Sequence, residues 1–312
     1  MGKFAGILMI FFLLQCGPSS VQKNLQEKAL TLFGVLPDSM PGMEEDTPAL
    51  EDLGKKLFIE KRLSEKGNIS CNSCHTVTDR KGGTGSEKTA GLKKRNVPTV
   101  LNAGYYSSYY WDGKFKELQK QILSHIQEEM GIGPASLESR LSPEYLDLIA
   151  KALPSNTKLN LEYIALSLSA YLHTLKTKDR FDDFVKGNFK ALSFEEISGM
   201  ETFIAVGCSD CHSTYLLGGG FRKMGEKNPY KNISDLGRFT VTNEEQDKMI
   251  FRVPSLRNIA LTGSYFHDGS TADLEDAISE MAFLQLNKRL SDRDIQKIAV
   301  FLKALTDKDR ER

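Results

Sequence analysis

Two pentapeptides in this chain contain residue types that bind a redox cofactor. They read CNSCH at residues 71–75 and CSDCH at residues 208–212, and together they use four of the five cysteines. A Cys-x-x-Cys pair followed directly by histidine is typical of covalent c-type haem attachment. The two sulfurs bond the porphyrin, and the histidine reaches the iron as its proximal ligand. The sequence therefore predicts two haem c groups, held by Cys71, Cys74, His75, Cys208, Cys211 and His212.

The other interpretations of a Cys-x-x-Cys pair are a redox dithiol and half of a zinc site. A dithiol does not need the histidine that follows the pair, and a zinc ion needs all its ligands clustered. Because the full pentapeptide occurs twice, we interpret both copies as haem attachment motifs.

The fifth cysteine, Cys16, ends an N-terminal segment typical of an export signal. An apolar stretch of about ten residues follows Lys3; it is too short to span a bilayer as a helix. The sequence LLQC resembles a lipobox, which predicts a lipid anchor at Cys16, with secretion without a lipid as the alternative. The protein is therefore expected on the periplasmic side of the membrane, which agrees with the predicted haem c. No cysteine remains for a disulfide framework.

The composition indicates one or two globular domains. The chain has 312 residues, of which 40% are hydrophobic, and its 41 basic and 41 acidic side chains give a formal net charge of zero. This balance does not support binding to nucleic acid or to an anionic membrane surface. We therefore expect no nucleic-acid partner.

Helical periodicity dominates the segments that must position the motifs. Thr47 and Pro48 are a predicted N-cap and first residue of a helix. Other helices are expected at residues 115–129, 143–152, 159–175, 194–206, 273–283 and 292–305. Glycine-rich loops lie at 79–91 and 217–220, and no segment alternates as a strand would. The predicted class is mostly α with long loops.

An internal duplication indicates two homologous domains. VPTVLNAGYYSSYYWDG at residues 97–113 aligns without gaps with VPSLRNIALTGSYFHDG at 253–269, an offset of 253 − 97 = 156. Each half has one such segment and one haem motif, so we predict two c-type cytochrome domains, each wrapping one covalently bound haem. The predicted divisions are a signal peptide at 1–16, a tether at 17–46, an N-terminal domain at 47–188 and a C-terminal domain at 189–312.

The two halves differ at two aligned positions that could serve the haems. Trp111 aligns with His267, and His125 aligns with Met281. A methionine thioether raises the potential of a haem that it ligates, so Met281 is a predicted distal ligand of a second haem that donates electrons. Most methionines only fill gaps in a core. The alternatives in the same half are Met200, Met224 and Met249.

From about residue 50 to residue 306 the chain resembles the bacterial di-haem cytochrome c peroxidases and the related MauG enzymes. The resemblance rests on LGKKLF before the first haem motif, on RNVPTVLNA followed by YWDG, and on FRVPSLRNIALTGSYFHDG. It also rests on Met281, fourteen residues after His267. In the peroxidases a methionine at this place is the distal ligand of the high-potential haem, whereas the MauG group has a tyrosine.

The resemblance implies further site residues. Trp111 matches an indole that lies between the haems, and His267 is counted among the cofactor-binding residues. Gln121 and Glu129 match the distal polar pair of the peroxidatic haem, although two residues usual between them are absent. There Glu129 moves a proton between the oxygens of peroxide. An interdomain calcium site is matched by Asn96, Thr262 and Ser264.

One departure from the family concerns the first haem. Many members have a histidine in the loop after the first motif that blocks the iron until the other haem is reduced. This chain has no histidine between His75 and His125. The expectation is a five-coordinate first haem that binds hydrogen peroxide without prior reduction. Three roles stay open for His125: an iron ligand, a distal acid or base, and a helix-surface residue.

The expected activity is reduction of hydrogen peroxide to water with electrons from a small cytochrome c or cupredoxin. One calcium ion and a homodimer are also implied by the resemblance. The alternatives are a MauG-like oxidation of a protein substrate and a non-catalytic di-haem electron carrier.

Overall fold

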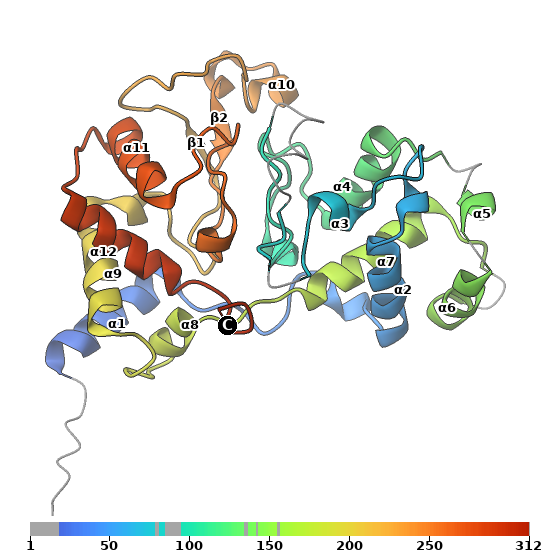
Figure 1. Cartoon of the computed structure of the whole chain (residues 1–312), viewed down its shortest axis with the longest axis horizontal. Coiled ribbons are helices and arrows are strands. Elements are labelled where there is room, and N and C mark those ends of the chain that lie inside the picture. Colours follow the sequence, from blue (N-terminus) through green and yellow to red (C-terminus); the bar gives the residue numbers. More distant parts are fainter. Residues whose placement is uncertain are drawn as a thin grey trace, which may run out of the picture.

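The computed structural model describes residues 19–78, 81–84, 95–133, 137–141, 143–154 and 157–311. Within these residues helices dominate, and they form two groups that lie side by side (Figure 1). This confirms the predicted mostly α class. The predicted signal segment with Cys16 and most of the loop at 79–91 lie outside the described residues.

The N-terminal domain is built around the helices α2 and α7. Its described α-helices are α2 (Pro48–Phe58), α3 (Cys71–Cys74), α4 (Leu118–Ser124), α5 (Leu137–Arg140), α6 (Glu144–Ala152) and α7 (Leu161–Thr174). Short 3-10 turns are η1 (Met43–Glu45), η2 (Lys61–Leu63) and η4 (Ala103–Tyr105), and η5 (His125–Glu129) is a π-helix that continues α4.

Helix α2 begins and packs as its sequence predicts. The Thr47 hydroxyl accepts a hydrogen bond from the Leu50 N–H at 3.2 Å. Pro48 lies in the first turn, where a backbone N–H would have no acceptor within the helix, so its missing N–H costs nothing. Gly54 allows α7 to approach closely, because a Cβ atom there would lie 1.8 Å from the Ser167 carbonyl oxygen. The glycine therefore determines how tightly the two central helices cross.

The C-terminal domain repeats this arrangement with α9 and α12. Its α-helices are α8 (Arg180–Val185), α9 (Phe194–Val206), α10 (Phe239–Thr242), α11 (Leu274–Leu286) and α12 (Asp292–Lys303). Its 3-10 turns are η7 (Cys208–Asp210), η8 (Glu245–Asp247) and η9 (Ile259–Leu261). A Cβ atom on Gly199 of α9 would lie 2.1 Å from the Lys297 carbonyl oxygen of α12, so a glycine again sets the helix crossing.

The sequence pattern predicts no strand, but the described residues contain two short ones. β1 (Phe221–Lys223) and β2 (Ile250–Arg252) pair antiparallel, with Phe221 opposite Arg252. Three residues are too few for an alternating pattern to stand out from the sequence. The pair forms one wall of the C-terminal haem motif's surroundings.

The duplicated segment has the same backbone in both domains. Asn102 and Asn258 have φ angles of 60° and 61°, and η4 and η9 follow them at equivalent places. The isolated bridge between Tyr109 and Phe115 is matched by one between Tyr265 and Thr271. Each pair of positions differs by the same 156 residues as the sequence repeat. The geometry therefore agrees with two homologous domains.

The predicted tether at 17–46 is not a free linker over residues 20–33. Residues 20–33 form α1 (Ser20–Phe33), which packs on the C-terminal domain, far from the domain that follows it in sequence (Figure 1). Leu25, Ala29 and Phe33 are buried there, and the ring centroids of Phe33 and Phe181 lie 5.6 Å apart. Three apolar residues at a spacing of four form only a narrow stripe in an otherwise polar segment. The sequence pattern therefore did not predict this helix.

The boundary between the domains lies earlier than the predicted residue 188. Phe181, Phe184 and Val185 of α8 are buried in the C-terminal core, so the chain crosses before this helix. Thr177 marks the crossing, because its hydroxyl accepts hydrogen bonds from Asn102 at 2.8 Å and from Asn258 at 3.4 Å. The two equivalent asparagines of the repeat thus meet on one linker residue.

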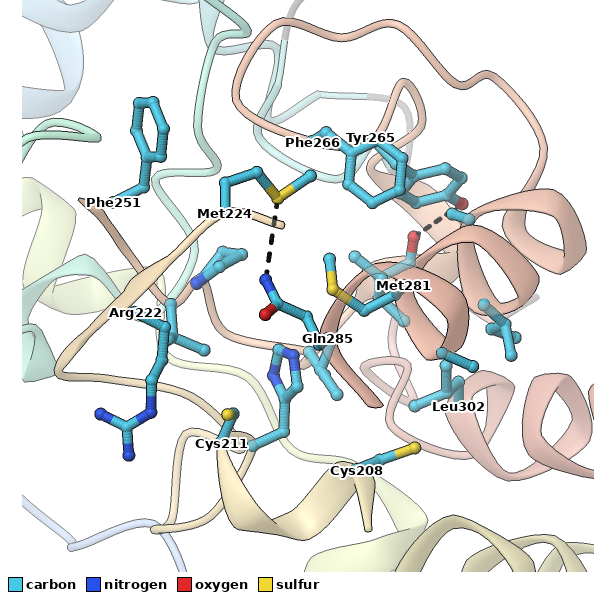
Figure 2. A pocket seen from close by; sticks show the side chains of 18 of the residues that line it. Cys208, Cys211, Arg222, Met224, Phe251, Tyr265, Phe266, Met281, Gln285 and Leu302 are labelled. Carbon is cyan, nitrogen blue, oxygen red and sulfur yellow. Dashed lines mark hydrogen bonds between the residues drawn. The ribbon is translucent and has the colours of Figure 1, made fainter. Parts of the chain in front are cut away.

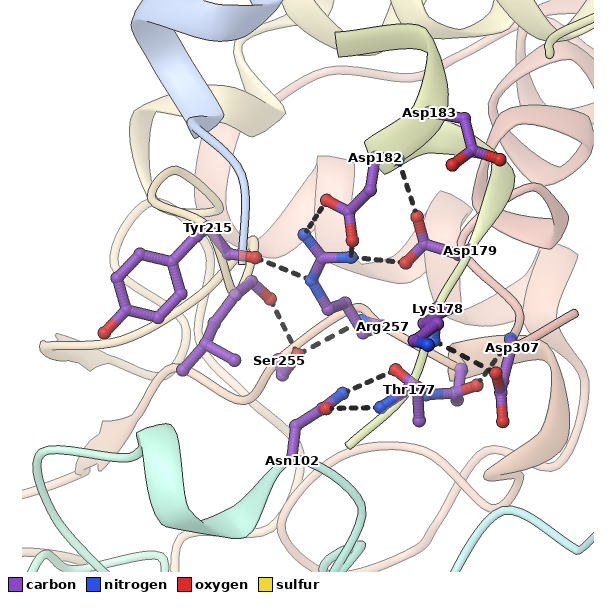
Figure 3. Close-up of polar contacts among 12 residues, drawn as sticks. Asn102, Thr177, Lys178, Asp179, Asp182, Asp183, Tyr215, Ser255, Arg257 and Asp307 are labelled. Atoms are coloured by element: carbon purple, nitrogen blue, oxygen red, sulfur yellow. Dashed lines mark hydrogen bonds and ion pairs between the residues drawn. The ribbon is translucent and has the colours of Figure 1, made fainter. Parts of the chain in front are cut away.

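A buried ion cluster fixes the linker to the C-terminal domain. Figure 3 shows the guanidinium of Arg257 between the carboxylates of Asp179 and Asp182. Arg257 Nη2 lies 2.8 Å from Asp182 Oδ1, and its Nε donates to the Tyr215 carbonyl at 2.6 Å. Asp179 also caps α8, accepting from the Asp182 N–H at 2.9 Å. Only 1% of the Arg257 side chain is exposed, so these contacts supply its counter-charge.

Candidate haem sites

The second haem motif opens onto an apolar cavity in the C-terminal domain. Cys208, Cys211 and His212 line it together with side chains of β2, α11 and α12, and it holds about 1180 Å³ of space including its mouth. The motif begins after Gly207, whose φ of 100° ends α9 and turns the chain into η7. A left-handed residue at this point favours glycine. The helix end thus presents both thiols at the cavity.

The ring of His212 is oriented by a main-chain contact. Its Nδ1 lies 3.0 Å from the Leu217 carbonyl oxygen, which accepts the hydrogen on that nitrogen. Burial lowers the pKa of His212, which favours the neutral imidazole. Nε2 is therefore the nitrogen left for a metal ion, the usual arrangement for a histidine ligand.

Two of the four methionines considered as distal ligands line this cavity. Met281 of α11 and Met224 both project into it (Figure 2). The amide of Gln285 donates to the sulfur of Met224 at 3.9 Å. Met200 is buried in the helical core, and Met249 does not line the cavity. The structure thus reduces the four methionines to two.

One side of the cavity carries a buried polar atom without a hydrogen-bond partner among the described residues. His267 is 2% exposed, and its Nε2 is buried without a hydrogen-bond partner in the described part of the chain. Its ring stacks on Phe251, with centroids 4.0 Å apart. An apolar cavity with two thiols, an oriented imidazole and a buried orphan donor fits a haem, whose macrocycle is apolar and whose carboxylates are charged.

Trp111 reaches this cavity from the N-terminal domain. Its side chain lines the cavity wall, and its Nε1–H donates to the Asn96 carbonyl at 2.8 Å. The Trp111 carbonyl in turn accepts from the Arg252 N–H at 2.8 Å. Trp111 is therefore held by its indole in the N-terminal domain and by its main chain to the C-terminal domain, and it lies where the two meet.

The first haem motif lies in the N-terminal domain, and its histidine is also oriented by a main-chain carbonyl. Cys71 and Cys74 lie on α3, and Nδ1 of His75 is 3.4 Å from the Gly83 carbonyl oxygen. Burial, with the nearby His125 as the next cause, lowers the pKa of His75 to about 4. Burial also raises the pKa of the Cys71 thiol to about 12, and that of Cys208 likewise. Thiols with a raised pKa remain protonated at neutral pH, and the thiolate is the reactive form in redox exchange. The raised pKa values therefore argue against a redox dithiol.

The π-helix η5 brings predicted residues together beside this motif. Nδ1 of His125 lies 3.1 Å from Oε2 of Glu129, and its side chain is 28% exposed. Tyr110 donates from its hydroxyl to Oε1 of Glu129 at 3.2 Å and contacts Gln121. Glu129 also acts electrostatically on Cys74. π-helical turns occur frequently at functional sites.

Tyr110 is the member of this group that sequence reasoning missed. Burial raises its pKa, with the Glu129 carboxylate as the next cause, so the phenol stays protonated and remains a donor. Its position directly before Trp111 in the duplicated segment was the available signal. Only the fold shows that its hydroxyl reaches Glu129.

Two of the three residues expected to bind calcium, Asn96 and Ser264, meet at the domain interface. The Asn96 amide nitrogen donates to the carbonyls of Ser264 at 2.6 Å and Phe266 at 3.2 Å. The Thr262 hydroxyl instead donates to the Ile259 carbonyl at 3.2 Å. The described residues contain no group of three or more His, Cys, Asp or Glu that could hold a metal ion. Amide and carbonyl oxygens are ligands that suit calcium. The three expected ligands include no carboxylate, so they would add no negative charge to the site.

Comparison with known proteins agrees with this geometry. The family model for di-haem cytochrome c peroxidase matches residues 48–190. The cytochrome c551 peroxidase of Pseudomonas aeruginosa is 38% identical, over 93% of this chain and 89% of that protein. The cytochrome c551 peroxidase of Nitrosomonas europaea is 37% identical, over 82% and 80%.

A solved structure shares the fold. It is a MauG-like protein associated with microbial copper homeostasis, 24% identical, with a TM-score of 0.75 over 88% of this chain and 94% of that one. Together with the two peroxidases, it shows that the resemblance extends over both domains. The chain belongs to the di-haem cytochrome c peroxidase family.

Proposed function

We propose that this protein reduces hydrogen peroxide to two waters, using two protons and two electrons supplied by a small cytochrome c or cupredoxin. The observation that carries the proposal is the asymmetry between two equivalent sites. Met281 projects into the C-terminal cavity, whereas His125 and Glu129 take the matching place on η5. A thioether suits electron storage, and a carboxylate suits proton transfer to a substrate. The two sites therefore divide electron supply and substrate chemistry.

The residues present would hold two haem c groups. Cys71, Cys74 and His75 would hold the first, and Cys208, Cys211, His212 and Met281 the second. The haems supply the iron that exchanges electrons and cleaves peroxide, while the chain supplies ligands, orientation and proton positions.

Trp111 couples the two sites in this proposal. It is 8% exposed, and its indole is fixed between the Asn96 carbonyl and the cavity wall. A rigid, buried π system between the sites suits electron transfer between domains. The role of His267 is to line the same wall beside it.

Glu129 is the proposed acid and base. It would accept a proton from one oxygen of hydrogen peroxide and deliver it to the other, which leaves as water. Tyr110 supports this role by donating to Oε1 of Glu129, whose Oε2 lies 3.1 Å from Nδ1 of His125. Gln121 contacts Tyr110 and completes the polar group.

The decisive experiment uses the fully oxidised, haem-loaded protein. Stopped-flow oxidation of a reduced small cytochrome c by hydrogen peroxide, without pre-reduction, should begin at once, because no histidine separates His75 from His125 in sequence. The His125→Ala variant should keep this immediate onset with slower turnover if His125 is a distal acid or base. A lag in the wild type that His125→Ala removes would identify His125 as an iron ligand. Silence before and after pre-reduction would refute the peroxidase.

The remaining assignments concern placement and assembly. We propose that residues 1–16 direct export to the periplasmic side and that Cys16 is lipidated there. No helix in the described residues has both the length and the apolar character needed to cross a bilayer. We also propose one calcium ion at Asn96, Thr262 and Ser264, and a homodimer. Calcium chelation followed by activity and sedimentation measurements tests the last two.

A further inference from the structure

Arg252 is a buried cation that the proposed mechanism does not use. It is the last residue of β2, 6% exposed, and it lines the C-terminal cavity. No Asp or Glu carboxylate of the described residues lies within ion-pair distance of it, in contrast to Arg257, which has two. A buried charge without a partner is costly, and proteins rarely retain one without a ligand.

The contacts of Arg252 orient its side chain without neutralising it. Its guanidinium carbon lies 4.6 Å from the ring centroid of Tyr106, and its Nε donates weakly to the Tyr110 carbonyl at 3.4 Å. Its main-chain N–H donates to the Trp111 carbonyl at 2.8 Å. Burial lowers the pKa of Arg252, and neighbouring tyrosines only partly oppose this. These contacts fix the side chain and leave its charge for an anion.

The position of Arg252 matches one edge of a haem. Cys208 and Cys211 would hold the vinyl edge of a haem, whose carboxylate-bearing propionates are on the opposite side of the macrocycle. Arg252 lies on the side of the cavity that faces the N-terminal domain, because its side chain contacts Tyr106 and the Tyr110 carbonyl there. Phe251, which lines the same cavity, lies well away from Cys208 in Figure 2. The orphan Nε2 of His267, stacked on Phe251, belongs to this same side.

We propose that Arg252 is the counter-charge of a propionate of the C-terminal haem, with His267 Nε2 as a second polar contact. This inference rests on the proposed haem site. Because Tyr106 and Trp111 belong to the N-terminal domain, the ion pair joins the carboxylate edge of one haem to the wall of the other domain. The pair raises the reduction potential of that haem, since a nearby positive charge favours the reduced state.

The test compares Arg252→Gln, Arg252→Lys and the control Arg222→Gln in haem-loaded protein. Arg222 also lines the cavity but is exposed on β1, where it donates to the Phe221 carbonyl. Covalent haem content is measured first. Resonance Raman spectra then report the propionate bending band, and potentiometry reports both midpoint potentials.

Arg252→Gln should shift the propionate band and lower the C-terminal potential, Arg252→Lys should restore most of both, and Arg222→Gln should change them less. An unchanged band and potential in Arg252→Gln, or equal changes in Arg222→Gln, would overturn the assignment. A lower melting temperature with unchanged spectra would mean that Arg252 only packs on Tyr106, which also overturns it. Failure of the wild type to bind two haems would instead refute the proposed haem sites. If Arg252→Gln does not accumulate, Arg252→Met replaces it. A propionate band and C-terminal potential equal to those of the wild type would then overturn the proposal, and a shifted band with a lower potential would support it.

Discussion

Removing Arg257 should destabilise the C-terminal domain severely. The Arg257→Met variant leaves the carboxylates of Asp179 and Asp182 without their counter-charge, and these side chains are 0% and 10% exposed. Breaking a buried pair by removing one partner costs about 3–5 kcal/mol. For a domain of this size, that corresponds to a melting temperature lower by roughly 10–15 °C.

The design includes a matched surface pair and a rescue. Lys308 and Asp183 form an ion pair of 2.6 Å near the same linker, but their side chains are 40% and 39% exposed, so Lys308→Met should cost less than about 1 kcal/mol. Combining Arg257→Met with Asp179→Asn and Asp182→Asn removes all three charges. An asparagine at position 179 keeps the oxygen that caps α8, so the triple variant should recover much of the loss.

Guanidinium unfolding of haem-loaded protein measures these differences, followed by far-UV circular dichroism and Soret absorbance in parallel. Coincident transitions allow free energies of unfolding to be compared. If Arg257→Met lost no more stability than Lys308→Met, the buried cluster would not hold the linker. If the triple variant were as unstable as Arg257→Met, lost shape would explain the effect better than unpaired charge.

Three further outcomes are expected. Met281→Leu should abolish the methionine-to-iron charge-transfer band and lower the potential of the C-terminal haem, whereas Met224→Leu should preserve the band; the reverse result would reassign the ligand. Glu129→Gln should reduce peroxide turnover by about 10²- to 10⁴-fold with unchanged haem content, and turnover equal to wild type would exclude it as the proton carrier. Glu60 has its pKa lowered from 4.5 to about 2, chiefly by Arg62, so it stabilises the fold above pH 4.5 and this contribution disappears as the pH falls towards 2. Glu60→Gln should therefore cost about 1 kcal/mol at neutral pH and flatten acid unfolding monitored by circular dichroism; parallel curves would contradict this.

The sequence alone was sufficient where the deciding pattern is local. Haem attachment needs two cysteines and a histidine within five residues, so both motifs are recognisable in the sequence alone. α9 was expected at residues 194–206 and is observed as Phe194–Val206, because its capping box and apolar periodicity lie within the helix. The duplication was also visible, since matched turn residues such as Asn102 and Asn258 require the same left-handed backbone.

Tertiary structure decided whatever depends on contacts between distant segments. α1 is a helix of the C-terminal domain because Phe33 packs against Phe181, a partner 148 residues away (181 − 33). Of the four methionines considered as distal ligands, only the residues that line the cavity show that Met224 and Met281 lie beside the second haem motif. No local pattern reveals that Tyr110 reaches Glu129, or that Arg252 has no carboxylate partner among the described residues. Such facts depend on burial and on long-range pairing, which the fold creates and a linear sequence does not state.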